Sequence, residues 1–276
     1  MRALVSELER PALPSAWQGL RLRLGLEGVR WPVDAAALAP IKRTTLVLAH
    51  TDDEINTCGL LSRLRAAGSA LDLVVLTDGA ANPWTDLRVV GDRTHFECRT
   101  EELRASMRLL DIGDAVLPGF PDGGLEKHLP AATALVQRHL EASRPDLVIT
   151  FEPSGINGHP DHVAAHRVTR DALAAAGISA GLAMITPPPP FSYALGSRYR
   201  AGERPTIATL SLTPEERERK ARLVEAYPSQ AKTLKLLLGG LPPRTFFRLF
   251  PREWYLWLPA ERALAWARAA ELPGPP

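Results

Sequence analysis

Two clusters of histidine and acidic residues carry the side chains most able to do chemistry. The first is His50-Thr51-Asp52-Asp53-Glu54, and the second is Gly158-His159-Pro160-Asp161-His162. Two imidazoles and one carboxylate, with a position left open for water, form the ligand set of a catalytic zinc site. Two neutral imidazoles and one carboxylate leave Zn²⁺ a net charge of about +1, enough to lower the pKa of a bound water toward ~7. The residue types therefore favour metal-assisted hydrolysis.

Each cluster taken alone also has a purely structural interpretation. Acidic residues such as Asp53 and Glu54 complement the dipole at a helix N-terminus, but that gives no reason for His50 at the end of a buried strand. His159 before Pro160, with Asp161 in the first turn, would serve as a helix cap. The chemical interpretation depends on the fold bringing the two clusters together.

Both clusters lie just beyond the carboxyl ends of predicted buried strands. Apolar runs of strand length alternate with segments of helical periodicity, and the second cluster opens a helix with Pro160 in its first turn. The predicted strands are Thr45–Ala49, Leu71–Leu76, Ala115–Leu117, Asp146–Phe151 and Ile207–Leu212, and the predicted helices are Glu54–Ala67, Glu97–Leu110, Pro130–Ala142, Pro160–Ala176 and one that Thr213 caps. This alternation predicts an α/β fold, a Rossmann-like and mostly parallel sheet with helices on both faces. The carboxyl ends of such strands build ligand crevices, so we expect the clusters to meet.

The two ends of the chain differ from this pattern. In Leu20–Leu26 every second residue is apolar, which predicts a strand, and we interpret residues 1–43 as an N-terminal arm packed on the main domain. Residues 44–276 form that domain, with a C-terminal extension from about residue 240. Phe246–Trp266 holds seven of the 17 aromatic residues, which favours core or subunit packing of this extension.

Composition narrows the class of protein. The chain has 276 residues, 33 basic and 31 acidic, and a net charge of +2, so no bulk field favours nucleic acid or membranes. No apolar run approaches the ~20 residues of a membrane span, and the N-terminus lacks a signal-peptide pattern. The two cysteines, Cys58 and Cys98, cannot build a disulfide framework. We expect a cytoplasmic protein.

The combination of the two clusters resembles the zinc-dependent LmbE-like, or PIG-L, deacetylases, which remove N-acyl groups from glucosamine-containing substrates. The resemblance runs from about Thr44 to Gln230. Further elements in matching order are Leu73–Gly79, Arg99–Leu103, Leu117–Leu125 and the stretch from Lys220 through Tyr227-Pro-Ser-Gln230. The resemblance implies an LmbE-like fold with one Zn²⁺ per chain, although Fe²⁺ accepts the same ligands.

The resemblance also implies residue roles. It makes His50, Asp53 and His162 the metal ligands and Asp52 the general base that takes a proton from the metal-bound water. A protonated His159 would stabilise the oxyanion, and could pass a proton to the departing amine. Further residues with implied roles are Asp161, which would orient an imidazole, and Arg99 and Asp122, which match positions that bind the sugar.

Two positions depart from the family pattern. Thr51 stands where the family usually has Pro or Ala, and its side chain is not needed for the chemistry. Asn157 stands where the branch that acts on thiol cofactors often has Tyr; it can donate a hydrogen bond, and we count it with the substrate-binding residues. His166, four residues after His162, is a possible fourth ligand, but a closed four-ligand site would block catalysis.

We therefore expect a metal-dependent hydrolase that removes an N-acyl group, N-acetyl above all, from an amino sugar or a glucosamine-containing conjugate by attack of metal-bound water. A metal-dependent phosphoesterase is an alternative, although such enzymes commonly use two metals and more carboxylates. A catalytically idle sugar-binding protein on the same scaffold is another. The expected partner is a small N-acetylated sugar or glycoconjugate, and a homo-oligomer is possible.

Overall fold

The computed structural model describes residues 29–30, 38–188 and 206–269. The predicted strand Leu20–Leu26 and the end of the proline run lie outside these ranges. The strands are β1 (Val29–Arg30), β2 (Arg43–Leu48), β3 (Ala70–Val75), β4 (Asp114–Val116), β5 (Leu147–Phe151), β6 (Gly181–Ile185), β7 (Thr206–Ser211) and β8 (Arg252–Leu258). The longer helices are α3 (Cys58–Ala66), α5 (His95–Leu110), α6 (Leu129–Ser143), α8 (Pro160–Ala176), α10 (Pro214–Glu225) and α13 (Ala260–Arg268). The shorter helices and 3-10 turns are η1 (Asp53–Thr57), α4 (Leu87–Val90), η2 (Leu125–His128), α7 (Gly155–Gly158), η3 (Pro228–Gln230), α11 (Ala231–Leu237) and α12 (Pro243–Leu249).

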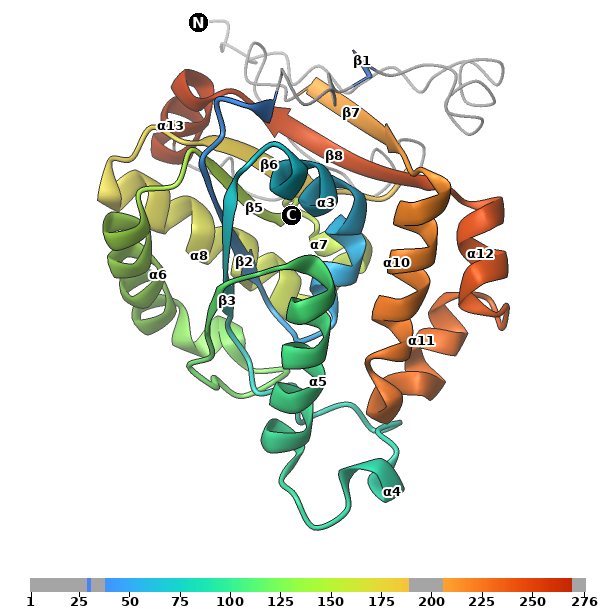
Figure 1. The fold of residues 1–276 in the computed structure, drawn as a ribbon. Helices are drawn as coiled ribbons and strands as arrows, with labels where there is room; N and C mark the ends of the chain where they lie inside the picture. Colours follow the sequence, from blue (N-terminus) through green and yellow to red (C-terminus); the bar gives the residue numbers. More distant parts are fainter. Residues whose placement is uncertain (1–28, 31–37, 189–205, 270–276) are drawn as a thin grey trace, which may run out of the picture.

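One mixed, mostly parallel sheet organises these elements (Figure 1). Its strand order is β1-β7-β8-β6-β5-β2-β3-β4, and β8 alone runs antiparallel to its neighbours. Chain order reverses at β2, because β3 and β4 are added on one side and β5 and β6 on the other. Ligands of open α/β sheets bind at such a switch point, beyond the carboxyl ends of the strands. The predicted fold class is confirmed.

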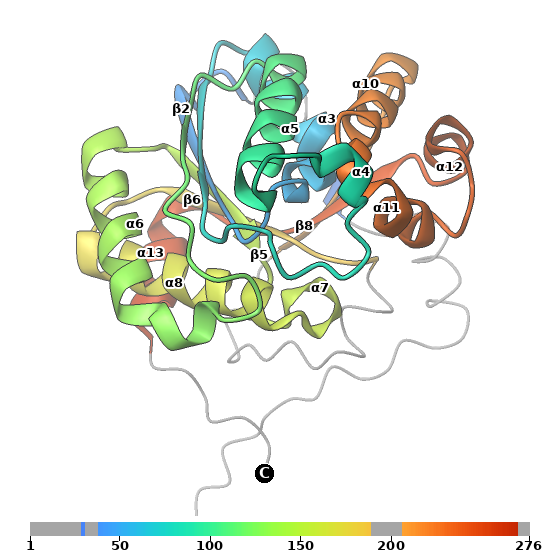
Figure 2. The same cartoon turned by 90° about the horizontal axis from the view of Figure 1, so that it is seen from below.

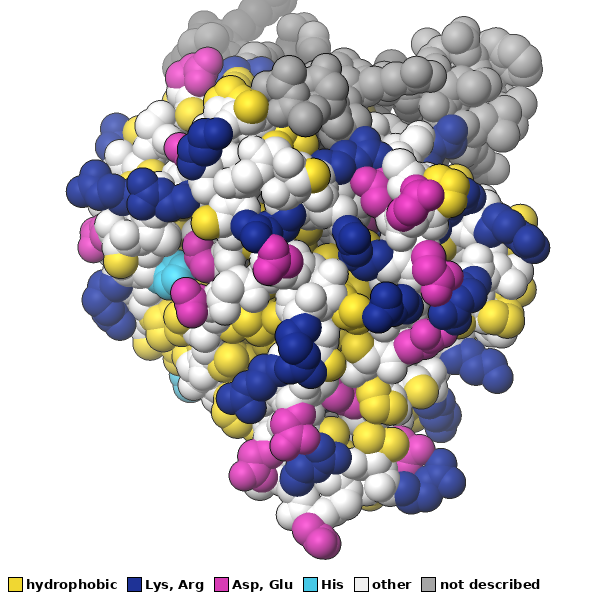
Figure 3. Space-filling model, viewed as in Figure 1, with side chains coloured by type: hydrophobic (Ala, Val, Ile, Leu, Met, Phe, Trp, Pro, Cys, Tyr) yellow, Lys and Arg dark blue, Asp and Glu magenta, His cyan; other side chains and the backbone are white. Residues whose placement is uncertain are grey.

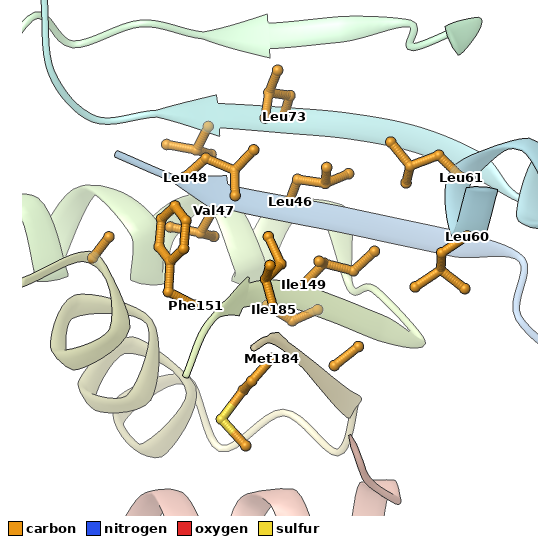
Figure 4. Close-up of a cluster of buried hydrophobic side chains, with 14 of the residues drawn as sticks. Leu46, Val47, Leu48, Leu60, Leu61, Leu73, Ile149, Phe151, Met184 and Ile185 are labelled. Carbon is orange, nitrogen blue, oxygen red and sulfur yellow. The ribbon is translucent and has the colours of Figure 1, made fainter. Parts of the chain in front are cut away.

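Helices cover both faces of the sheet (Figure 2). Helices α3, α5 and α10 lie on one face, while α6, α8 and α13 lie on the other. The core between them is aliphatic, and Figure 4 shows Leu46 and Leu48 of β2 with Leu73 and Ile149 of the neighbouring strands β3 and β5. Strands buried on both faces explain the continuous apolar runs in the sequence.

The C-terminal segment is part of the sheet. β8 lies between β6 and β7, so the segment from about residue 240 contributes an interior strand rather than an appended extension. Its aromatic residues Phe247, Trp254 and Tyr255 are buried. Aromatic side chains bury large apolar areas, and core packing was one of the two expected roles of this segment.

At the other end, two described residues connect the predicted arm to the sheet. β1 pairs in parallel with β7 at the sheet edge. Leu38 joins the core, and Asp146 accepts hydrogen bonds from the backbone N–H groups of Lys42 and Arg43 at the start of β2. The arm as a unit over residues 1–43 stays a prediction.

The helix predicted for Glu54–Ala67 divides into η1 and α3. Asp52, just before η1, has φ 108° and ψ −14°, a left-handed conformation that starts the chain on a 3-10 turn instead of an α-helix. α8 spans Pro160–Ala176, as expected, and Thr213 forms the expected capping box with Glu216.

Surface charge is mixed on the face in Figure 3, where basic and acidic side chains are interspersed. Arg244 and Glu218 form an exposed ion pair. None of the helices in the described ranges is long and apolar enough to cross a membrane.

Candidate metal and catalytic site

The two sequence clusters meet at the switch point of the sheet. β2 leads into His50 and η1, and the adjacent parallel strand β5 leads through α7 into α8, which carries His162 in its first turn. The ring of Phe151, the last residue of β5, stacks on His162 with ring centroids 4.0 Å apart and planes 4° from parallel. The strand ends therefore fix the positions of both imidazoles.

Three side chains converge with the spacing of metal ligands. Nδ1 of His50 lies 3.3 Å from Nε2 of His162, and the same Nε2 atom of His162 lies 3.3 Å from Oδ1 of Asp53. The remaining separation, from Nδ1 of His50 to Oδ2 of Asp53, is 3.5 Å. Ligand atoms 2.0–2.1 Å from a tetrahedral ion lie about 3.3–3.4 Å from one another. Nitrogen atoms of His50, His159 and His162 also lie within 4.8 Å of one another, as do ligand atoms of His50, Asp122 and Asp161.

The hydrogen bonds behind these ligand atoms leave them as acceptors. Nδ1 of His162 lies 3.2 Å from the carbonyl oxygen of Gly155, to which it donates in the neutral tautomer, so Nε2 keeps its lone pair. Nε2 of His50 faces carboxylates, which leaves Nδ1 as its lone-pair nitrogen. The backbone N–H of His50 donates to Oδ2 of Asp53 and orients that carboxylate. Two lone pairs that face one another across about 3.3 Å repel each other unless a proton or a metal ion lies between them.

The pKa shifts of His50 and Asp53 also show that this site favours a positive charge. Burial lowers the pKa of His50, but the carboxylates of Asp122, Asp161 and Asp53 outweigh burial and raise it well above its usual value. Burial opposes ionisation of Asp53, yet His162 and His50 lower its pKa. A proton occupies this place in the metal-free protein, and a metal ion competes with it. The residues present therefore fit a divalent metal.

Two carboxylates fix the far side of the His50 ring. Nε2 of His50 lies 3.1 Å from Oδ1 of Asp122 and 3.3 Å from Oδ2 of Asp161. Asp161 also accepts hydrogen bonds from the backbone N–H groups of Gly123 and Leu125. Burial raises the pKa of Asp161, but these donors and His50 lower it to about 2. Asp161 thus lies where a residue that orients an imidazole is expected, and Asp122 contacts the same imidazole.

Asp52 directly precedes Asp53, and its carboxylate contacts Arg99. Its Oδ2 lies 3.1 Å from Nη2 of Arg99, which also donates to the carbonyl oxygen of Thr51. Burial raises the pKa of Asp52, and Arg99 opposes that shift. Arg99 is only 3% exposed and contacts Asp52, and its predicted contact with the sugar stays a prediction.

His159 lies next to both other imidazoles. Its ring centroid is 4.7 Å from that of His50 and 4.7 Å from that of His162. Nδ1 accepts a hydrogen bond from the backbone N–H of Asp161, which puts the proton of the neutral ring on Nε2. Burial and the two neighbouring imidazoles lower the pKa of His159. These shifts favour a neutral His159 rather than the protonated ring that the sequence suggested.

A buried network next to Asp52 was not anticipated from the sequence. Glu54 accepts hydrogen bonds from the backbone N–H of Asp52 at Oε2 and from the hydroxyls of Ser106 and Tyr227 at Oε1. Burial raises the pKa of Glu54 to about 7, although both hydroxyls oppose the shift. The third acid of Asp-Asp-Glu was the available signal, but nothing local identifies a partner 173 positions away.

Three further residues that the sequence singled out can be located in part. The side chain of Asn157 lies outside the described part of the structure. His166 is 3% exposed and its Nδ1 contacts the carbonyl oxygen of Phe151, so it lies under the site and not on the surface. Cys58 is fully buried, and burial raises the pKa of its thiol to about 12, as fits a small apolar core residue.

Comparisons with known proteins identify the family of this chain. A family model described as GlcNAc-PI de-N-acetylase matches residues 45–173, which include both clusters. The 1D-myo-inositol 2-acetamido-2-deoxy-α-D-glucopyranoside deacetylase of Mycobacteroides abscessus is 31% identical over 190 residues, covering 54% of this chain and 67% of that protein. The enzyme of the same name from Streptomyces griseus is 32% identical over 164 residues, 51% of this chain and 50% of that protein.

A solved structure shares the fold. The N,N'-diacetylchitobiose deacetylase from Pyrococcus horikoshii superposes with a TM-score of 0.58 at 18% identity, over 80% of this chain and 85% of that one. The chain spans between half and two thirds of the two curated relatives. From the sequence match, the relatives and the shared fold together, the chain belongs to the PIG-L family, the LmbE-like deacetylases.

Proposed function

We propose that the chain is a zinc-dependent N-deacetylase that hydrolyses the acetamide of an N-acetylated amino sugar within a small glycoconjugate. The observation that carries this proposal is the convergence of His50 Nδ1, His162 Nε2 and the Asp53 carboxylate at distances of 3.3–3.5 Å, with Asp52 beside them. These three residues would hold the ion. When bound, Zn²⁺ would polarise the amide carbonyl and make water a stronger nucleophile near neutral pH.

Asp52 and His159 have separate roles in the reaction: Asp52 transfers the proton, and His159 stabilises the oxyanion. Asp52 takes the proton from the attacking water, because its carboxylate is not among the converging ligand atoms and Arg99 favours its ionised form. His159, neutral with its proton on Nε2, donates a hydrogen bond to the oxyanion that forms on the amide carbonyl. Collapse of the tetrahedral intermediate breaks the C–N bond, and the amine leaves with the proton that Asp52 held.

Other residues of the site support these groups. Asp122 and Asp161 hold the His50 ring through its Nε2 atom, which fixes the tautomer that a ligand needs. Arg99 orients Asp52, and a direct contact with the sugar is a second role that the family resemblance suggests for Arg99 and Asp122. Asn157 precedes His159 by two residues, and we assign it to the substrate as well.

The substrate class rests on the relatives. Two of them are named as deacetylases of a glucosamine–inositol conjugate, and a structural neighbour is named for diacetylchitobiose. The shared group is an equatorial acetamide on a glucosamine ring. We propose that this chain hydrolyses the same acetamide group, and the assay below tests which aglycone it accepts.

The test is an amine-release assay of the metal-free protein reloaded with Zn²⁺ or, without oxygen, with Fe²⁺. Candidate substrates are N-acetylglucosamine, its inositol and malate conjugates, diacetylchitobiose and nucleotide sugars. Metal-dependent amine release at about one metal per chain is the expected result. Absence of turnover on every acetamide, combined with hydrolysis of p-nitrophenyl phosphate at two metals per chain, would replace the proposal with the phosphoesterase. Tight sugar binding without turnover would indicate an idle sugar-binding protein.

A further inference from the structure

The backbone of Asp52 is held in a conformation that its side chain does not favour. Its φ of 108° lies in the left-handed region, which costs a non-glycine residue of order 1–3 kcal/mol. Such a conformation persists only where surrounding contacts impose it. The same residue carries the carboxylate that takes the proton in the proposed function, so those contacts decide where the base points.

Two residues provide the contacts. Glu54 accepts the backbone N–H of Asp52 at 3.0 Å, and Arg99 contacts the Asp52 carboxylate at 3.1 Å and the Thr51 carbonyl. One contact fixes the peptide that precedes Asp52 and the other fixes its side chain. Each of these two residues in turn needs a fixed position.

Both residues are in contact with Tyr227. Its hydroxyl donates to Oε1 of Glu54 at 2.7 Å, and the guanidinium carbon of Arg99 lies 5.5 Å from the centroid of its ring. Tyr227 is fully buried between α10 and η3, whereas Glu54 belongs to η1 after β2. A single side chain from the C-terminal part of the chain thus supports both contacts that set Asp52.

We propose that Tyr227 is a positioning residue for Asp52, acting on its backbone through Glu54 and on its carboxylate through Arg99. This inference rests on the proposed function, since it takes Asp52 as the base. Ser106 supplies the second hydroxyl to the same Glu54 oxygen and completes the arrangement.

The variant Tyr227→Phe removes the hydroxyl and keeps the ring under Arg99. We expect kcat to fall about 10-fold with KM and zinc content unchanged, because a small displacement of a catalytic group is costly. Tyr255→Phe is the matched control: Tyr255 is also buried, and its hydroxyl donates to buried Glu253 at 2.8 Å. The control should lose comparable thermal stability with kcat within about twofold of the native enzyme.

A double-mutant cycle separates positioning from general damage to the fold. In the Asp52→Asn background the base is already absent, so Tyr227→Phe should lower the residual rate by less than twofold. An equal loss in both backgrounds would overturn the inference, as would a native kcat in Tyr227→Phe. Absence of deacetylase activity in the native protein is a different result and contradicts the proposed function.

Hydrogen exchange reports on the same relationship without any turnover. The Asp52 N–H is protected by Glu54, so in the zinc-loaded protein Tyr227→Phe should raise exchange in a peptide spanning residues 50–57 by about 10-fold. Tyr255→Phe should leave the exchange of Asp52 N–H unchanged when that amide is followed individually. Unchanged exchange of Asp52 in Tyr227→Phe would overturn the inference even if the substrate is still unknown.

Discussion

Asp122 Oδ1 lies 3.1 Å from Nε2 of His50, the ring nitrogen that does not face His162. The other oxygen of Asp122 accepts the backbone N–H of Ala81 at 2.8 Å, so each oxygen already has a protein donor. A carboxylate behind a ligating imidazole fixes its tautomer and raises its basicity. We therefore propose that Asp122 supports His50 as a metal ligand, in addition to the sugar contact that the family resemblance implies.

The variant Asp122→Asn tests that role. An amide must place its NH₂ against either the His50 ring or the Ala81 N–H, since both are donors. We expect zinc affinity, measured by competition with a chromophoric chelator, to weaken about 10-fold, with Asp161 preserving part of the support. Asp86→Asn is the control, because the half-buried Asp86 caps α4 and pairs with the exposed Arg88. An unchanged zinc affinity with a raised KM would assign Asp122 to the sugar.

Adjacent aspartates should give opposite results when each is replaced by asparagine. Asp53→Asn removes a carboxylate from the converging ligands and should abolish stoichiometric zinc, measured by elemental analysis after dialysis. Asp52→Asn should retain about one zinc per chain while kcat falls by at least about 100-fold, the usual contribution of a general base. A near-native rate in Asp52→Asn would eliminate Asp52 as the base.

Arg99 should determine the pH dependence of turnover. Burial raises the pKa of Asp52 and Arg99 counteracts the shift, so Arg99→Gln should raise that pKa further. A base with a higher pKa is ionised to a smaller extent at acidic pH, so the acidic limb of kcat/KM should move to higher pH. Arg63→Gln, whose guanidinium pairs with Glu216 away from the site, is the control. A raised KM with an unmoved acidic limb would favour the sugar contact.

His166 should make the metal-free protein sensitive to acid. Burial lowers its folded-state pKa to about 4, whereas the unfolded chain has a value near 6.5. Above pH 6.5 both states are neutral, and between pH 6.5 and 4 the unfolded state gains the proton first, which lowers the unfolding free energy by up to about 3 kcal/mol. His166→Asn retains a donor for the Phe151 carbonyl and does not titrate. In urea denaturation, the native protein should lose more stability than this variant between pH 7 and pH 4.5; parallel losses would exclude His166 as the cause.

Much of the site was accessible to sequence reasoning because strand ends obey a topological rule. Continuous apolar runs identified β2 and β5, and parallel neighbours place whatever follows them at one edge of the sheet. This is why His50 and His162 could be brought together across 112 positions. Hydrogen-bond partners such as Asp122 for His50 or Tyr227 for Glu54 depend on side-chain directions, which no periodicity encodes.

The positions of β6 and β8 in the sheet were hard to predict for a similar reason. β6 begins four residues after Gly177, the C-cap of α8, and its Gly-Leu-Ala-Met-Ile sequence has a single β-branched residue, which is a weak strand signal. β8 was interpreted as an extension because its aromatic residues fit a core or an interface equally well. Its position depends on antiparallel pairing with both β6 and β7, and that choice of neighbours is not encoded in the local sequence.

The contact between Gly181 and Trp257 tests whether β8 is an integral strand. A Cβ at Gly181 would lie 2.8 Å from Cη2 of Trp257, so Gly181→Ala should lower the unfolding free energy by about 1–3 kcal/mol through overpacking. Gly113→Ala, where the nearest atom would lie 3.6 Å away, should change it by less than about 0.5 kcal/mol. Adding Trp257→Phe should recover part of the loss in Gly181→Ala, because the smaller ring vacates the position of the clash. Equal stability of the two alanine variants in urea denaturation would contradict the close packing of Trp257 on Gly181.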